Sequence, residues 1–173
     1  RLADGGHELV LVDHPLVPAK TRNLAPLERF RFLDHVAFLH WIRNEAGPLK
    51  GVFHLGACSS TTESRWEYLR QNNLEYSQSL WDWCTRADCP FVYASSAATY
   101  GDGSLGFDDR LPPADLRPLN LYGKSKNDFD VWALEQVAAG LAPPRWAGVK
   151  FFNVYGPGET HKGKMASVVW HAY

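Results

Sequence analysis

Short apolar segments that alternate with helical segments constrain the fold of this chain most strongly. The apolar segments predicted as strands are Glu8 to Val12, Gly51 to Leu55, Pro90 to Ala94 and Ala147 to Phe152. The segments with helical spacing are Asp34 to Ala46, Thr62 to Ala87 and Tyr122 to Ala139. Runs that are apolar at successive positions are typical of strands buried on both faces of a parallel sheet. The alternation predicts an α/β fold with a Rossmann-like, doubly wound parallel sheet.

The segment after the first strand is less regular. Pro15 to Pro26 is predicted as a polar loop that holds Lys20 and Arg22, and Arg29 to Leu33 as a weak strand. Asp34 is the predicted N-cap of the helix that follows, because its carboxylate can accept from the free N–H groups of the first turn.

Composition excludes several classes of protein. The 173 residues carry 18 Lys+Arg against 19 Asp+Glu, a formal net charge of −1, which argues against a nucleic-acid partner. No apolar stretch reaches the ~20 residues of a membrane span. Cys58, Cys84 and Cys89 form no C-x-x-C pair and the histidines form no H-x-x-x-H pair, so a metal site and a disulfide framework are not expected. This cysteine usage favours a reducing, cytoplasmic location.

Tyr122 and Lys126 are the strongest chemical signal. They are four residues apart and therefore share one face of the predicted helix. A tyrosine with a pKa near ~10 is a poor base at neutral pH, and a nearby ammonium lowers that pKa. Ser96, at the end of the preceding strand, offers a hydroxyl for the same substrate oxygen. A Tyr and a Lys at this spacing are common on any helix, but after a strand that ends in Ser-Ser the pair indicates catalysis.

Asp13 ends the first predicted strand. An acid there can bind a ribose hydroxyl of an adenine nucleotide, although an ordinary turn-forming Asp before Pro15 is the plain alternative. Lys20 and Arg22 follow in the same loop and suit a 2′-phosphate, so these residues leave NAD and NADP both open.

Two further loops carry candidate residues. Gly56 to Ser60 is a run of small residues after a strand, which lets a flat cofactor approach the backbone. Cys58 in this run is predicted to pack rather than react, because no base accompanies it. Lys162 and Lys164 lie among glycines, where they are either a solvated basic loop or groups for a diphosphate or for acid–base work.

Four motifs identify the chain as similar to a known family. They are HLGACSSTTE at 54–63, YASSAATYG at 93–101, PLNLYGKSK at 118–126 and FFNVYGPGETHKGKMAS at 151–167. The chain resembles the extended, nucleotide-sugar branch of the short-chain dehydrogenase/reductase superfamily. Within that branch it resembles the ADP-L-glycero-D-manno-heptose 6-epimerase family most, through the first and last of these motifs.

The resemblance implies an activity and assigns roles. It implies oxidation of C6 of an ADP-heptose with tightly held NADP, followed by re-reduction on the opposite face. The implied catalytic residues are Tyr122, Lys162, Ser96 and Lys126. The implied cofactor contacts are Asp13, His14, Lys20, Leu55, Gly56, Ala57, Cys58, Ser59, Asn72, Lys126, Val154 and Lys162. The implied substrate contacts are Ser96, Asn153, Lys164 and His171. The resemblance also implies a homo-oligomer, a pentamer, in the cytoplasm, and a place in lipopolysaccharide core precursor synthesis.

The sequence departs from the family at several points. Lys164 stands where the family has Ser, and the glycine-rich first turn is not found before Asp13. We expect a chain shortened at both ends, with a cofactor domain at 1–153 and the start of a substrate domain at 154–173. Two alternatives stay open: another nucleotide-sugar epimerase or 4,6-dehydratase, and a non-catalytic nucleotide-binding module.

Overall fold

The computed structural model of the chain describes residues 5–14 and 18–172, apart from the side chains of Ala19, Thr160, Lys164 and Met165. The chain divides into two compact units. Unit 1 comprises Arg1–Ala46 and Asn153–Tyr173, and unit 2 comprises Gly47–Phe152. The predicted division into a cofactor domain and a substrate domain follows function rather than compactness, and it stays a prediction.

Unit 2 is built on a parallel sheet of three strands in the order β3-β4-β5. Its strands are β3 (Val52–His54), β4 (Phe91–Ser96) and β5 (Trp146–Phe151). Helical segments connect them: α3 (Trp66–Leu69), the π-helical η1 (Arg70–Glu75), α4 (Tyr76–Arg86) and α5 (Leu121–Ala138). Two short 3-10 turns, η2 (Ala97–Tyr100) and η3 (Pro113–Asp115), lie between β4 and α5.

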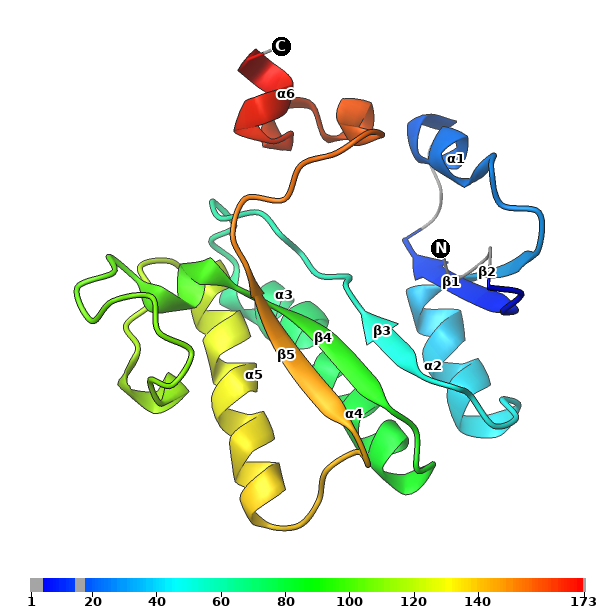
Figure 1. Cartoon of the computed structure of the whole chain (residues 1–173), viewed down its shortest axis with the longest axis horizontal. Helices are drawn as coiled ribbons and strands as arrows, with labels where there is room; N and C mark the ends of the chain where they lie inside the picture. The colour runs from blue at the N-terminus through cyan, green and yellow to red at the C-terminus, as the bar shows by residue number, and fades with distance from the viewer. Residues whose placement is uncertain (1–4, 15–17, 173) are drawn as a thin grey trace. The chain divides into compact units, whose positions relative to one another are not determined.

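Helices α4 and α5 cover one face of this sheet (Figure 1). The fully buried ring of Trp81 on α4 contacts Phe91 of β4 edge to face, at 6.0 Å between centroids. Phe129 of α5 contacts Tyr93 of β4 in the same way, at 4.8 Å. Because side chains alternate along a strand, Phe91, Tyr93 and Ser95 all point toward the helices. The core of unit 2 therefore lies between β4 and the helices α4 and α5.

The helical run between β3 and β4 differs in detail from the prediction of one helix from Thr62 to Ala87. It begins at Trp66, and its middle turn, Arg70–Glu75, is π-helical. Residues 59–65 precede it without helical structure. A π-helical turn widens the backbone ring by one residue and changes the direction in which its side chains point, a feature frequent at functional sites.

Unit 1 combines the two ends of the chain. Strands β1 (Leu9–Asp13) and β2 (Phe30–Asp34) pair in parallel, with Asp13 beside Asp34. The helical segments are α1 (Pro18–Leu24), α2 (His35–Asn44), η4 (Glu159–Met165) and α6 (Val168–Ala172). Asp34 is confirmed as the N-cap of α2, since its Oδ1 accepts from the Val36 backbone N–H at 2.9 Å.

The prediction of a loop over Pro15 to Pro26 was wrong within its described part. Residues 18–24 form helix α1, while residues 15–17 lie outside the described residues. Pro18 suits the first helical position, because its fixed φ fits a helix and its missing N–H would have no partner there. The segment has no apolar periodicity, which is why the sequence pattern did not reveal it.

The predicted parallel α/β, Rossmann-like class is confirmed. In the described residues the strands form two parallel sheets, β1-β2 and β3-β4-β5, rather than one continuous sheet. Every described pairing is parallel, and helical segments connect consecutive strands. None of the helices in the described part of the chain is long and apolar enough to cross a membrane.

Candidate active site

The start of α5 presents Tyr122 and Lys126. Asn120 caps the helix, its Oδ1 accepting from the Gly123 backbone N–H at 2.7 Å. A Cβ on Gly123 would lie 2.7 Å from the carbonyl oxygen of Ala98, so only glycine allows this approach. Since Ala98 follows Ser96 in η2, the glycine lets the first turn of α5 pack against the end of β4. The predicted association of Tyr122 and Lys126 with the Ser96 strand end therefore has a structural basis.

Lys126 is a buried cation, with 4% of the residue exposed. Burial lowers the pKa of its ammonium to about 8, and the negative charge of Asp130 partly opposes that shift. His54, at the end of β3, is also buried. Burial first, and the charge of Lys126 second, lower the pKa of His54 to about 3. The imidazole is therefore neutral near pH 7, and its Nε2 lies 2.9 Å from Ser77 Oγ.

Ser96 ends β4 and caps the 3-10 turn that follows. Its Oγ accepts from the Ala98 backbone N–H at 3.2 Å. A hydroxyl that accepts one bond keeps its proton for donation. The side chain is nearly buried, so a ligand oxygen that contacts it is largely desolvated. Ser96 can thus donate to an oxygen of a ligand bound at the carboxyl end of β4.

Asn73 joins the loop after β3 to helix α5, and sequence reasoning missed this role. It is fully buried in the π-helical turn η1. Its Oδ1 accepts from Cys58 N at 2.8 Å, and its Nδ2 donates to Cys58 O at 3.0 Å and to Ser125 Oγ at 2.9 Å. Ser125 in turn donates to the carbonyl of Tyr122 at 2.7 Å. The available signal was an asparagine on the apolar side of the predicted helix, where an unpaired amide is costly.

The loop that Asn73 holds contains the predicted cofactor contacts of unit 2. Leu55, Gly56, Ala57 and Ser59 are exposed, and Cys58 is half-buried. These small residues at the carboxyl end of β3 leave room for a flat group, and a Cβ on Gly56 would meet no atom within 4 Å. Asn72 is half-buried, and its Nδ2 donates within the helix to Tyr68 O at 2.8 Å. The residues fit the nicotinamide cofactor that the fold class implies, and unit 2 would hold it along this loop.

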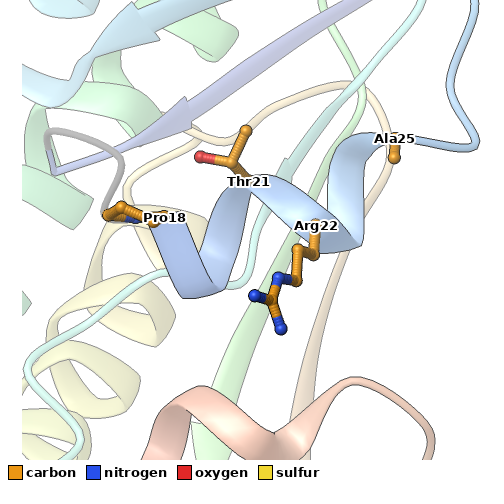
Figure 2. A pocket seen from close by; sticks show the side chains of 4 residues that line it. All are labelled: Pro18, Thr21, Arg22 and Ala25. Atoms are coloured by element: carbon orange, nitrogen blue, oxygen red, sulfur yellow. The ribbon is translucent and has the colours of Figure 1, made fainter.

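The predicted cofactor contacts at the end of β1 lie in unit 1. Asp13 pairs with Lys20 at 2.8 Å, and the His14 backbone N–H donates to the same carboxylate at 2.7 Å. The His14 ring also contacts His35 at 4.3 Å between centroids. Arg22 extends from α1 beside an open hollow of about 520 Å³ lined by Pro18, Thr21, Arg22 and Ala25 (Figure 2). Lys20 thus pairs with the acid that the sequence offers for a ribose contact, and Arg22 lies on the same helix as Lys20.

The remaining predicted residues lie in the C-terminal part of unit 1. Lys162 in η4 approaches Glu159, with 3.8 Å between Nζ and Oε2. Glu159 is buried and accepts from the backbone N–H groups of Ser167 at 2.7 Å and Gly156 at 2.8 Å, which lower its pKa. An ionised Glu159 therefore fixes the loop that carries Lys162 and offers that ammonium a counter-charge.

Of the predicted substrate contacts in this part, Asn153 and His171 are described and exposed, as is the predicted cofactor contact Val154. The side chain of Lys164 lies outside the described residues. A second hollow, of about 510 Å³, is lined by Tyr155, Gly156, Glu159, Ser167, Val169 and Trp170.

The predicted site residues thus form two sets. Unit 2 brings together Ser96, Tyr122, Lys126, Asn72 and the loop at 55–59, and unit 1 holds Asp13, His14, Lys20, Asn153, Val154, Lys162 and His171. Among the described residues, no three His, Cys, Asp or Glu side chains cluster as a metal would require.

A Ser–Tyr–Lys set beside a small-residue loop, at the carboxyl ends of parallel strands, defines a class of Rossmann-type enzymes that work with nicotinamide cofactors. Comparison with family models agrees, since one model matches residues 1–173. The chain belongs to the NAD dependent epimerase/dehydratase family.

Three curated relatives are ADP-L-glycero-D-manno-heptose-6-epimerases. That of Fusobacterium nucleatum is 42% identical over 98% of this chain and 52% of its own length. That of Nitratidesulfovibrio vulgaris (strain DP4) is 43% identical over 98% of the chain and 52% of its own length. That of Alkalilimnicola ehrlichii is 43% identical over 96% of this chain and 51% of its own length. The chain therefore spans about half the length of the curated relatives it matches.

Solved structures share the fold. The Helicobacter pylori ADP-L-glycero-D-manno-heptose-6-epimerase matches with a TM-score of 0.75 and 24% identity, over 95% of this chain and 52% of that one. The UDP-glucose 4-epimerase of Thermotoga maritima matches with a TM-score of 0.75 and 24% identity, over 97% of this chain and 54% of that one. At this identity the two structures support the fold and do not distinguish a 6-epimerase from a 4-epimerase.

Proposed function

We propose that this chain supplies the cofactor-binding and proton-transfer residues of an ADP-L-glycero-D-manno-heptose 6-epimerase. The reaction converts ADP-D-glycero-D-manno-heptose to its L-glycero epimer at C6, by transient oxidation and re-reduction, for lipopolysaccharide core precursors. The observation that carries the proposal is the packing of the Tyr122–Lys126 turn against the Ser96 strand end. It occurs in a chain 42% identical, over 98% of its length, to such an epimerase.

Tyr122 is the proposed acid–base group on one side of C6. Ser96 donates a hydrogen bond to the C6 oxygen and fixes it near the phenol. The buried ammonium of Lys126 lies one helical turn away on the same face of α5, and we assign it the role of supporting Tyr122, which takes the proton of that oxygen. A nicotinamide cofactor held along residues 55–59 would supply the chemistry of hydride removal from C6 and hydride return to the same carbon.

Lys162 is the proposed acid–base group for the opposite face. Inversion at C6 needs a proton donor and acceptor on each side of the carbon, since the carbonyl oxygen changes orientation before re-reduction. The Lys162 ammonium has Glu159 at 3.8 Å as a fixed counter-charge, which keeps its loop in one arrangement. We assign substrate contacts to Asn153, Lys164 and His171 in the same part of the chain.

We propose NADP as the cofactor, with NAD as the less favoured form. Asp13 already pairs with Lys20 at 2.8 Å, so its charge is balanced and a 2′-phosphate nearby meets less repulsion. Lys20 and Arg22 then provide the positive charges for that phosphate. The proposed contacts along the dinucleotide are His14, residues 55–59, Asn72, Lys126, Val154 and Lys162.

We also propose that the protein works in the cytoplasm as a homo-oligomer, a pentamer. Cys58, Cys84 and Cys89 are free thiols, which suits a reducing compartment. The oligomeric state rests on the family resemblance, and light scattering coupled to gel filtration measures it.

The test of the function is epimerisation itself. The protein is incubated with ADP-D-glycero-D-manno-heptose, without added cofactor, and proton NMR follows the C6 configuration. We expect the L-glycero product, and a loss of at least ~10²-fold in rate for Tyr122→Phe. Absence of product from the wild-type protein, or an undiminished Tyr122→Phe rate, would overturn the proposal.

A UDP-sugar 4-epimerase is the second candidate, because such an enzyme shares the fold with an equal TM-score of 0.75. The Lys162 loop distinguishes the two, because the 6-epimerase proposal gives Lys162 a proton-transfer role. We expect Lys162→Ala to lose epimerisation of the ADP-heptose. Turnover of UDP-glucose that is insensitive to Lys162→Ala would instead establish the 4-epimerase.

A further inference from the structure

Asp130 is the centre of a buried polar cluster that the proposed mechanism does not use. It lies on α5, and only 4% of the residue is exposed. Its Oδ1 accepts from the Tyr93 hydroxyl at 3.0 Å, and its Oδ2 accepts from Ser95 Oγ at 2.6 Å. The same Oδ2 forms an ion pair with Lys150 Nζ at 2.5 Å. Three elements, β4, β5 and α5, therefore meet at one carboxylate.

The cluster is built into the sheet by its register. Ser95 pairs with Lys150 and Tyr93 pairs with Gly148 across the parallel strands β4 and β5. A Cβ on Gly148 would lie 2.4 Å from the Tyr93 hydroxyl, so a glycine is needed for that phenol to reach Asp130. Burial raises the pKa of Tyr93 far above its ordinary value, and the phenol remains a donor to Asp130.

Two branches lead from this ion pair to Ser96. On one side, Asp130 fixes Ser95, the direct neighbour of Ser96. On the other side, Lys150 Nζ donates to Thr99 Oγ1 at 2.8 Å, and Thr99 Oγ1 donates to the Ser96 carbonyl at 2.8 Å. The backbone on both sides of Ser96 is thus tied to one buried pair of charges.

A third branch leads to Lys126. Asp130 follows Lys126 by four residues, so both side chains lie on one face of α5. Both are buried, which makes their attraction stronger than at a surface. The charge of Asp130 supports the protonated form of Lys126 against the effect of burial.

Charged and titratable groups approach this cluster from several elements. Tyr122 and Asp130 lie on the same helix as Lys126. His54 of β3, Tyr93 of β4, Tyr100 of η2 and Lys150 of β5 face the cluster from the others, with Lys150 Nζ 5.4 Å from the centre of the Tyr100 ring. The charges on α3 and η1, which are Glu67, Arg70 and Glu75, pair with one another. Asp130 is the anion of this buried set.

We propose that Asp130 and Lys150 are a positioning pair that holds Ser96 and the Lys126 ammonium in register beneath Tyr122. The expected effect on catalysis rests on the proposed epimerase function. The expected effect on the pKa of Lys126 does not depend on that function. Asp130 supports the ammonium, and Lys150 limits how strongly it does so. Removing the charge of Asp130 therefore lowers the pKa of Lys126, and removing the charge of Lys150 raises it. A purely structural role of the pair predicts no such opposite shifts.

The test measures Lys126 directly. Lysine side chains are labelled with ¹³C, the Lys126 resonance is assigned by its loss in Lys126→Met, and its titration is followed by NMR in the protein. We expect Asp130→Asn to lower the pKa of Lys126 by about one unit from its value near 8, and Lys150→Met to raise it by about one unit. Asp128→Asn is the matched control, because Asp128 pairs with Lys124 on the same helix. We expect no shift of Lys126 in that control.

The activity arm separates this proposal from the proposed function. In Asp130→Asn the pH range of epimerisation should move with the Lys126 titration, and kcat near pH 7 should fall about twofold, because a pKa lowered from about 8 to about 7 leaves half of the Lys126 side chains protonated at that pH. If the wild-type protein does not epimerise ADP-heptose, the function fails, and the NMR arm still decides on the positioning pair.

The outcomes are distinct. Opposite shifts of Lys126 in the two single variants, with none in the control, support the proposal. Shifts in the same direction, or no shifts, overturn it. If either single variant does not fold, the double variant Asp130→Asn/Lys150→Met removes both members of the ion pair together. Compared with the single variant that folds, the double variant should move the Lys126 pKa back toward the wild-type value, and a double variant equal to that single variant overturns the proposal.

Discussion

Asn73→Ala is the substitution that tests the site architecture most sharply. Asn73 is fully buried, and its amide makes two hydrogen bonds to the Cys58 backbone and one to Ser125. Alanine removes all three and leaves their partners without the amide. At about 1 kcal/mol for each net hydrogen bond, the free energy of unfolding should fall by about 3 kcal/mol.

Asn72→Ala is the matched control, one residue away. The Asn72 amide makes one hydrogen bond, to Tyr68 O within the same helical run, and the side chain is half-buried. We expect its effect on the free energy of unfolding to stay below about 1 kcal/mol. As a proposed cofactor contact, Asn72 should instead affect nucleotide affinity.

Urea unfolding of the cofactor-free protein, followed by circular dichroism, measures both variants. The expected result is a lower midpoint for Asn73→Ala at an unchanged slope, and a midpoint near that of the wild type for Asn72→Ala. Equal midpoints for the two variants would refute the idea that Asn73 joins the cofactor loop to α5.

Three further substitutions follow from the structure. His54 has a pKa of about 3 against 6.5 for the free side chain. Between these two pH values the imidazole is protonated in the unfolded chain and neutral in the folded chain. Stability therefore falls as the pH drops from 6.5 toward 3, and His54→Gln should remove about 3 kcal/mol of that loss by pH 4 in unfolding titrations. Gly123→Ala places a Cβ 2.7 Å from Ala98 O and should cost about 1–3 kcal/mol of stability, along with catalytic rate; a neutral effect on both contradicts the close packing. Lys20→Ala should weaken NADP binding about tenfold and NAD binding little by calorimetry, and equal losses would argue against a 2′-phosphate contact.

Local patterns predicted the elements that carry the catalytic set. The strand that ends at Ser96 and the helix that bears Tyr122 and Lys126 follow from apolar runs and helical spacing. The cap at Asp34 follows from a short polar side chain before a helical segment. These features depend on neighbours within a few residues, which is why the sequence is enough to place them.

The contacts that organise the site depend on distant residues. Asn73 meets Cys58 across 15 positions and Ser125 across 52. Asp130 meets Lys150 across 20 positions through strand register. No local pattern encodes such pairings, so the sequence alone assigned no role to Asn73, Asp130 or Lys150. Helix α1 was missed for a different reason, since its residues have no apolar periodicity.

The fate of the hydrogen on C6 tests the proposed reaction most directly. ADP-D-glycero-D-manno-heptose carrying deuterium at C6 is incubated with the protein in ordinary water, and the product is examined by NMR. Transient oxidation and re-reduction at one carbon predicts an L-glycero product that retains deuterium at C6. Loss of the deuterium to solvent, or an unchanged configuration at C6, would contradict the account.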